Sequence, residues 1–433
     1  MPQGEAVTYR GATVITGGLA NPVIESADLV VEGTRLVSVE PAGRREARGR
    51  VVDLSGRHVM PALINPHVHI GYMRDGVGDA SNYSRENVLD HLRRFAYHGV
   101  SVVQSLGTDR DDTELILRDQ QRSGELSDPG LATLLTAGTG LVAPTPGSTN
   151  GGARFATDVV NEVTDPEAAR AIVRSLAAQR VDVVKFWIDS RGGQKTKMQP
   201  PVYQAIIDQS HLERLKVVAH IYDLDDAKGV IRAGADGTAH LVRDPGHDDE
   251  LIALLLERDA FVFTSLGIQR SAVVGPALLD DPLLAETVSA SARDAIRERM
   301  RSAPPAQLDH LNGVYQTLRR EVAAFVAADV RLVLSADTGV ATQFPGFAEH
   351  FELESMVEAG MPAIRAINAG TEQSARVLGI EKQQGTLAPG KRADFLVLDA
   401  DPLDDIRNTR RISDVYLGGR RLDRTAMRAR WAA

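Results

Sequence analysis

The chain has 433 residues, a formal net charge of −9, 43% apolar residues and 25% charged residues. This length favours one large domain with a smaller one, and the composition is that of a folded globular protein. A mildly acidic chain without a basic stripe is a poor partner for nucleic acid or anionic membranes. The absence of cysteine excludes disulfides and thiolate ligands, so any metal must be bound by nitrogen and oxygen atoms.

Targeting and membrane segments are not evident in the sequence. The first residues lack the basic and then apolar regions of a signal peptide. No uncharged apolar run approaches the roughly 20 residues that span a bilayer. We therefore expect a cytoplasmic protein with a small-molecule ligand as its partner and neither nucleic acid nor membrane.

The two ends of the chain share one sequence pattern. Residues 7–60 contain short Val, Leu, Ile and Thr runs broken by Gly and Pro, which predicts short strands and turns. The same pattern returns in QQGTLAPGKRADFLVLDADP and ISDVYLGGRRL near the C-terminus. We expect residues 1–60 and 384–433 to form one small β-sandwich domain, into which the middle of the chain is inserted.

The middle of the chain, residues 61–383, alternates between apolar runs and helix-like stretches. Continuous apolar runs are typical of buried parallel strands joined by helical crossovers. The eight runs are ALINPHV, VSVVQSL, ATLLTA, DVVKFWI, VVAHI, DGTAHL, AFVFTS and RLVLSAD. The fold class is therefore α/β, with a (β/α)8 TIM-like barrel. Two long segments, 138–165 and 265–312, are expected to leave its C-terminal face and shape a substrate pocket.

Potential metal ligands begin in the first of these runs. His67 and His69 are two residues apart in NPHVHI, so both imidazoles point to one side of a strand. Lys185 lies inside the apolar run VDVVKFWID, where a free ammonium is costly to bury. It either pairs with a buried carboxylate or has reacted with CO₂ to give a carbamate that can bridge two cations. Burial favours the carbamate because it lowers the lysine pKa.

Three further candidates end later runs. His220 ends VVAH, His240 ends GTAH and Asp337 ends LVLSAD. A buried Asp in an apolar strand needs a cation or several hydrogen-bond donors. Because all these residues lie at the carboxyl ends of strands, where barrel enzymes place their chemistry, the set predicts a metal site.

These motifs resemble the amidohydrolase superfamily, and within it the imidazolonepropionase-like and prolidase-like binuclear enzymes. The resemblance extends from VMPALINPHVH through VVAHIY, GADGTAHL and LVLSADTG to GTLAPGKRADFLVLDADPL. It implies two divalent metal ions, with zinc expected. The more buried ion would be held by His67, His69 and Asp337, the more exposed one by His220 and His240, and the Lys185 carbamate would bridge them.

The resemblance also implies a reaction. A hydroxide between the ions would attack the substrate, and Asp337 would take its proton and later give it to the leaving group. The loop after the third strand lacks the His-containing element that many of these relatives carry, so the resemblance does not specify a substrate.

Substrate contacts are predicted at three positions. Tyr222 follows His220 by two residues, and prolidase-like relatives use a Tyr there to hold the substrate. Arg191, in DSRGGQK, could bind a carboxylate with its planar fork. Asn150 lies in the long third loop. Packing, or a solvated loop position, is the alternative for each of them.

The leading functional hypothesis is hydrolysis of an amide C–N bond in a dipeptide, including one with a C-terminal proline, or in an N-acyl amino acid. A second hypothesis is hydrolysis of a cyclic amide, carbamate, urea or lactone at the same centre. Lys185 argues against deamination, because the superfamily's deaminases usually have one metal and lack the bridging lysine. A non-catalytic scaffold is a remote alternative, because such proteins tend to lose metal ligands. We also expect a homo-oligomer, as is common for barrel enzymes of this kind.

Overall fold

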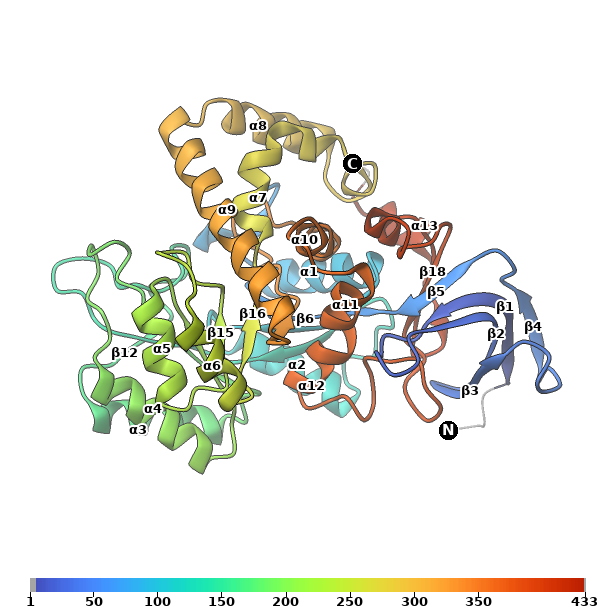
Figure 1. Cartoon of the computed structure of the whole chain (residues 1–433), viewed down its shortest axis with the longest axis horizontal. Helices are drawn as coiled ribbons and strands as arrows, with labels where there is room; N and C mark the ends of the chain where they lie inside the picture. Colours follow the sequence, from blue (N-terminus) through green and yellow to red (C-terminus); the bar gives the residue numbers. More distant parts are fainter. Residues whose placement is uncertain (1–4, 432–433) are drawn as a thin grey trace.

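The computed structural model describes residues 5–431; residues 1–4 and 432–433 of the predicted terminal domain lie outside this range. Both ends of the chain contribute to one eight-stranded sheet, which lies at one side of the molecule in Figure 1. Its strands are β1 (Val7–Ile15), β2 (Val23–Glu32), β3 (Arg35–Pro41), β4 (Arg50–Asp53), β5 (His58–Pro61), β18 (Phe395–Leu398), β19 (Ile412–Leu417) and β20 (Arg420–Arg421). The expected β structure from both termini is therefore confirmed.

The two ends are joined where β18 pairs antiparallel with β5. Strand β1 pairs with β2 along one edge and with β4 and then β5 along the other. An aromatic trio forms the centre of this sheet's own core: the ring centroids of Tyr9 lie 5.3 Å from Phe395 and 5.0 Å from Tyr416. The exact division at residues 60 and 384 stays a prediction.

The middle of the chain supplies eight parallel strands in the predicted order. They are β6 (Leu63–Val68), β9 (Val100–Ser105), β10 (Thr133–Thr136), β13 (Val184–Trp187), β14 (Val217–His220), β15 (Gly237–Ala239), β16 (Phe261–Phe263) and β17 (Arg331–Val333). The ring is closed by two links: the Asp182 N–H donates to the Thr136 carbonyl at 2.9 Å, and Val68 bridges to Thr338 beyond β17. The (β/α)8 barrel is confirmed.

Helices follow the strands and cover the barrel from outside (Figure 1). They are α1 (Arg85–Tyr97), α2 (Thr113–Ser123), α3 (Pro166–Ala178), α4 (Pro200–Leu212), α5 (Leu224–Arg232), α6 (Asp249–Glu257), α9 (Pro305–Ala327), α10 (Phe347–Glu358), α11 (Ala363–Asn368) and α12 (Ser374–Val377). The sequence sets several starts: Ser84 caps α1, and Asp165 caps α3 ahead of Pro166.

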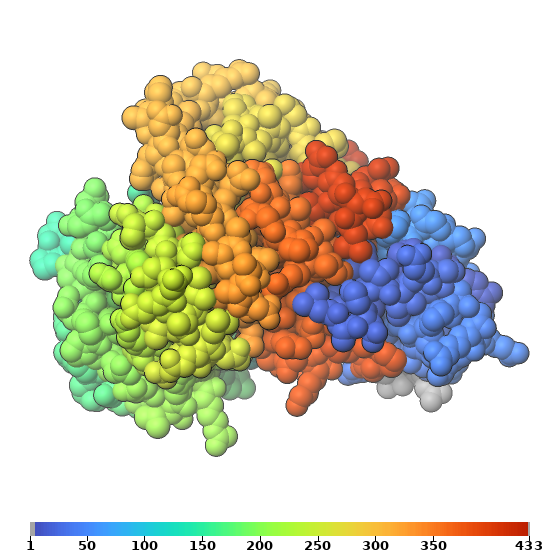
Figure 2. All heavy atoms as spheres, in the orientation of Figure 1, coloured from blue at the N-terminus to red at the C-terminus, as the bar shows by residue number. Residues whose placement is uncertain are grey.

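The segment after β16 builds a projecting helical lobe. It contains α7 (Gly267–Val274), α8 (Ala290–Arg301) and the first half of α9, seen in yellow and orange at the top of Figures 1 and 2. Its apolar side chains pack with Met73 of the hairpin β7 (Met73–Arg74) and β8 (Val77–Gly78), and with Phe347 of α10. The lobe is thus anchored to the loop that follows β6.

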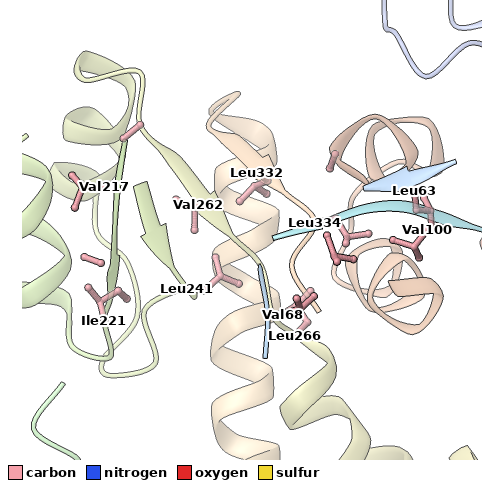
Figure 3. Close-up of a cluster of buried hydrophobic side chains, with 14 of the residues drawn as sticks. Leu63, Val68, Val100, Val217, Ile221, Leu241, Val262, Leu266, Leu332 and Leu334 are labelled. Atoms are coloured by element: carbon pink, nitrogen blue, oxygen red, sulfur yellow. The ribbon is translucent and has the colours of Figure 1, made fainter. Parts of the chain in front are cut away.

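Two apolar cores hold the barrel. One lies between strands and helices, where Leu63, Val100, Val217, Val262 and Leu332 from five of the strands are buried (Figure 3). The other fills the inside of the barrel and draws on seven strands or the residues next to them. Its members are Leu106, Ala137, Val183, Val218, Ala239, Phe261, Phe263, Val333 and Val377.

Shorter elements complete the chain. They are η1 (Ala80–Asn82), β11 (Leu141–Val142), β12 (Asn161–Glu162), η2 (Gly275–Asp280), η3 (Leu284–Glu286), η4 (Ala369–Gln373), η5 (Ile406–Arg410) and α13 (Arg424–Arg428). Within residues 5–431, no helix is both long and apolar enough to cross a membrane.

Candidate metal centre

Strand alternation turns two of the predicted ligands toward the barrel interior. Val183 belongs to the inner core and Phe186 to the outer one, so Lys185, two residues after Val183, shares the inward face. His220 follows the inner residue Val218 in the same way. Lys185 is fully buried, and its Nζ has no hydrogen-bond partner among the described residues.

Asp337 gathers three imidazoles around its carboxylate. Its Oδ1 lies 3.2 Å from His67 Nε2 and 3.3 Å from His69 Nε2, and its Oδ2 lies 3.8 Å from His240 Nε2. His67, His240 and Asp337 each offer a ligand atom within 4.8 Å of the others. The structure therefore brings together residues from the first, sixth and eighth strands of the barrel.

His220 joins this group from the fifth strand. Its ring centroid lies 4.7 Å from that of His240, and its Nε2 lies 3.4 Å from Asp189 Oδ2. The sequence interpretation missed Asp189, which is buried. It ends the apolar run VDVVKFWID and stands four residues after Lys185, so two-residue alternation counted from Lys185 could have found it.

The backbone is strained at two of the candidate ligands. His240 has φ +81° and Asp337 has φ +48°, the left-handed region that residues other than glycine seldom adopt. Such conformations persist only where surrounding contacts enforce them, and they concentrate at functional sites. His240 follows directly on β15, whose last residue, Ala239, belongs to the inner core, so the turn at His240 directs inward a side chain that simple alternation would place on the other face. Asp337 lies four residues beyond the end of β17.

Hydrogen bonds orient the first pair of histidines. His67 Nδ1 lies 3.0 Å from Ser335 Oγ, and His69 Nδ1 lies 3.0 Å from Thr108 Oγ1. With Nδ1 engaged, Nε2 of each ring faces Asp337, as is usual for metal-binding histidines. Asn65 Oδ1 accepts the His67 backbone N–H, which fixes the chain at the end of β6.

The electrostatics of the cluster suit a bound cation. Burial lowers the pKa of Lys185 to about 7 and that of His220 to about 3, and it holds the pKa of His67 and His240 well below the usual range. Neutral imidazoles are the form that binds metal.

Unpaired atoms provide the test of fit. Among the described residues, His67 Nε2, His220 Nε2, Asp337 Oδ1 and Lys185 Nζ are buried without a hydrogen-bond partner. Buried polar atoms normally have hydrogen-bond partners, so a group of buried polar atoms without partners indicates a site for a bound ion. Nitrogen and oxygen donors of this kind fit divalent cations such as zinc. Only a lysine amine that has lost its proton or become a carbamate is compatible with that ion.

A cavity of about 600 Å³ opens above this cluster. Its floor includes His69, His220, His240 and Asp337. Its walls come from the loop after β10, from the helical lobe and from the ends of several strands. The wall residues are Gly76, Val77, Gly78, Ala153, Arg154, Phe155, Trp187, Arg191, Arg243, Ile268, Gln269, Arg299, Gly339, Val340 and Ala341. Both long segments singled out in the sequence, 138–165 and 265–312, thus contribute to the pocket.

Of the three residues predicted to contact the substrate, only Arg191 lines the cavity. Arg191 lines the cavity, but its Nη1 is paired with Asp189 Oδ2 at 2.9 Å and its Nη2 donates to the Gly151 carbonyl. Tyr222 does not line this cavity; its ring lies against Arg243. The Asn150 side chain is used within its own loop, where Nδ2 donates to the Thr157 carbonyl. Direct substrate contact by these residues stays a prediction.

Known proteins resemble this chain in sequence and in fold. The amidohydrolase family model matches residues 58–422. An uncharacterized protein of Mycobacterium bovis is 25% identical over 381 residues, which cover 86% of this chain and 85% of that protein. A 5-methylthioadenosine/S-adenosylhomocysteine deaminase of Bacillus cereus is 23% identical over 445 residues, covering 96% of this chain and 93% of the deaminase. A crystal structure of a candidate prolidase from Bifidobacterium longum is 25% identical, with a TM-score of 0.76 over all of both chains.

The family match covers most of the chain, so the protein belongs to the amidohydrolase family. The resemblance seen in the sequence is confirmed, and the chain is a hydrolase of this family. Its relatives act on different compounds, so the family alone does not specify the substrate.

Proposed function

We propose that the protein hydrolyses an amide C–N bond in a small molecule, with a dipeptide or an N-acyl amino acid as the substrate class. One observation carries this proposal: His69, His220, His240 and Asp337 line the floor of a cavity, and buried polar atoms of the candidate ligands lack hydrogen-bond partners among the described residues. The six candidates come from five barrel strands or the residues that follow them. A packing role does not account for them, because orphaned buried polar atoms destabilise a core.

The proposal assigns two divalent ions, with zinc expected, to His67, His69, His220, His240 and Asp337, with Lys185 as a carbamate between them. The bound ions would lower the pKa of water and polarise the scissile carbonyl. Neutral His67 and His240 support this assignment, as does the depressed pKa of Lys185, which leaves the amine free to react with CO₂.

Asp337 is proposed as the proton carrier. Its carboxylate is at the centre of the cluster and lines the cavity. Its neighbours hold its pKa well below the usual range, so it is ionised and able to accept a proton. As water oxygen bonds to the carbonyl carbon, Asp337 takes the proton; as the C–N bond breaks, it gives that proton to the departing nitrogen. No covalent enzyme intermediate is required.

Lys185 separates this proposal from deamination. A lysine carbamate serves a two-ion hydrolytic site, and Lys185 lies fully buried against the other candidates. The 23% identity to a deaminase covers the shared fold and gives no substrate for this chain.

The test is metal per chain by elemental analysis, after expression with added zinc and bicarbonate. We expect about two ions per chain, as a bridged pair requires. Lys185→Ala should lose metal, whereas Lys382→Ala, at an exposed lysine outside the barrel, should retain it. Full occupancy in Lys185→Ala would refute the carbamate bridge.

Activity is then measured on dipeptides, N-acyl amino acids, cyclic amides, carbamates, ureas and lactones. Release of amine from the first two groups supports the proposal. Turnover restricted to the other groups would replace it with the second hypothesis.

A further inference from the structure

Arg243 is the one cavity arginine whose charged group is both partly buried and unpaired within residues 5–431. It stands three residues after His240 and lines the cavity above the metal cluster. Its Nε is buried without a hydrogen-bond partner, and no described carboxylate oxygen lies within 4.0 Å of its guanidinium. A buried guanidinium is costly unless a hydrogen-bonded anion accompanies it, so a partner from solution is expected.

The other arginines of the cavity are in different circumstances. Arg191 is tied to Asp189 and to a backbone carbonyl. Arg299, on α8, donates to the Gly76 carbonyl at 2.9 Å and is exposed. Arg154 is exposed at the rim. Among these four arginines, Arg243 alone combines a partly buried side chain with a guanidinium group that has no partner among the described residues.

Neighbouring groups hold Arg243 in place. Its backbone N–H donates to the Tyr222 carbonyl at 2.9 Å, and its guanidinium carbon lies 5.5 Å from the Tyr222 ring centroid. The preceding N–H, that of Val242, donates to buried Glu321 Oε1 at 3.1 Å. An arginine stacked on an aromatic ring keeps its charge and loses little entropy when an anion binds. Tyr222 would thus support the substrate indirectly, through Arg243.

The charge of the residues that line the cavity also favours an anionic ligand. Four arginines line it, and Asp337, at the floor, is the carboxylate among the lining residues. A concave site with this balance attracts anions. Guanidinium groups bind carboxylates through two parallel hydrogen bonds, a geometry that a neutral ester, urea or lactone cannot offer.

We infer that Arg243 binds a carboxylate of the substrate and makes this enzyme selective for anionic amides. The inference rests on the proposed amide hydrolysis and narrows it to dipeptides and N-acyl amino acids with a free carboxylate. Neutral carbamates, ureas and lactones lack the group that Arg243 requires.

The test compares an acid with its neutral counterpart. N-benzoylglycine and N-benzoylglycinamide share one scissile bond and differ in the carboxylate. Binding to the metal-loaded protein is followed by calorimetry, and hydrolysis is followed separately by release of benzoate. We expect the acid to bind at least about 30-fold more tightly than the amide, as a charge-assisted pair contributes about 2 kcal/mol or more.

Arg243→Gln should abolish most of this preference while retaining its metal, and Arg243→Lys should restore part of it. Arg299→Gln removes the same charge from the same cavity and should reduce the preference less than about threefold. Loss of preference in Arg243→Gln with the metal retained supports the inference.

Three results would overturn it: no preference for the acid in the wild-type protein, an unchanged preference in Arg243→Gln, or an equal loss in Arg299→Gln. The binding assay separates this failure from that of the proposed function. Acid-selective binding without benzoate release, in this pair and in the wider amide panel, would contradict the hydrolysis and leave the carboxylate site standing.

Discussion

Asp337 lies at the centre of the candidate site. Three histidine Nε2 atoms lie within 3.8 Å of its carboxylate oxygens, and its backbone adopts a left-handed conformation that aims it into the cluster. One oxygen can therefore hold a cation while the group also accepts a proton. An amide in its place could still bind a cation weakly, but it could not carry a proton.

Asp337→Asn should lower kcat by about 1000-fold on any substrate of the wild-type protein, because general acid–base transfer contributes roughly 100- to 10,000-fold. Metal per chain should fall only in part. Steady-state kinetics and elemental analysis on the same preparation check this. Asp329→Asn, at a carboxylate that is 86% exposed beyond the barrel, serves as the control and should leave both values unchanged. Near-normal turnover in Asp337→Asn would remove its assigned role.

At the scale of elements, the site depends on how closely two strand ends approach. The chain leaving β17 runs alongside the chain leaving β6, where Val68 and Thr338 form a parallel bridge and the His69 N–H donates to the Thr338 carbonyl at 2.7 Å. Gly339, with φ +100°, stands so close that an added Cβ would collide with the His69 carbonyl oxygen. This close contact between the two segments closes the barrel and places His69 next to Asp337.

Gly339→Ala should therefore reduce the free energy of unfolding by about 2–4 kcal/mol and lower metal occupancy, because the collision is with backbone. Gly379→Ala is the matched control. Gly379 has φ +70° with nothing within 4 Å of an added Cβ, so that variant should lose only about 1 kcal/mol. Denaturant unfolding and metal analysis measure both effects. Equal losses in the two variants would show that the positive φ alone, and not the collision with the His69 carbonyl oxygen, is responsible.

The whole molecule buries several carboxylates inside its barrel layer. Burial raises the pKa of Glu349 and of Glu352 to about 7, and that of Glu321 to about 8. Glu349, on α10, links the ends of two strands, because its Oε1 accepts from Asn65 and from Thr338. Folding therefore holds protons that an unfolded chain would release at neutral pH, and this affects the stability of the entire fold.

The sign of the effect follows from the pKa of Glu349, which folding raises from 4.5 to about 7. Between these pH values Glu349 is protonated in the folded chain and ionised in the unfolded chain. The contribution of this protonation to the free energy of unfolding is therefore complete below pH 4.5 and is lost as the pH rises through 7. Glu349→Gln keeps the oxygen acceptor and removes this titration. At pH 8 the free energy of unfolding of this variant should exceed that of the wild-type protein by about 1 kcal/mol or more. Denaturant unfolding measures the difference.

At pH 4.5 that advantage should be absent. Glu257→Gln, at an exposed carboxylate ending α6, is the control and should show no such dependence. A difference between Glu349→Gln and the wild-type protein that stays constant with pH would contradict the assignment.

The sequence by itself determined the architecture and most of the residues that gather at the candidate site. Each barrel strand is a continuous apolar run, because its two faces are both buried, and the eight runs are found as strands in the predicted order. The ligand candidates were visible because a His, Lys or Asp within or at the end of an apolar run is costly without a partner. Spacing of two along a strand then gives the face, as for His67 and His69.

Only the tertiary structure decided what surrounds that cluster. The structure shows that the buried Nε of Arg243 has no partner among the described residues and that the Asn150 side chain binds within its own loop. Neither property can be predicted from the local sequence pattern. Ser335 and Thr108, which orient His67 and His69, lie far from them in the chain. Loops and strand ends adopt backbone conformations fixed by contacts with distant segments, whereas strand and helix patterns arise from local burial. The side chains of the candidate site could therefore be predicted from the sequence, whereas the lining of the cavity above them depends on the tertiary structure.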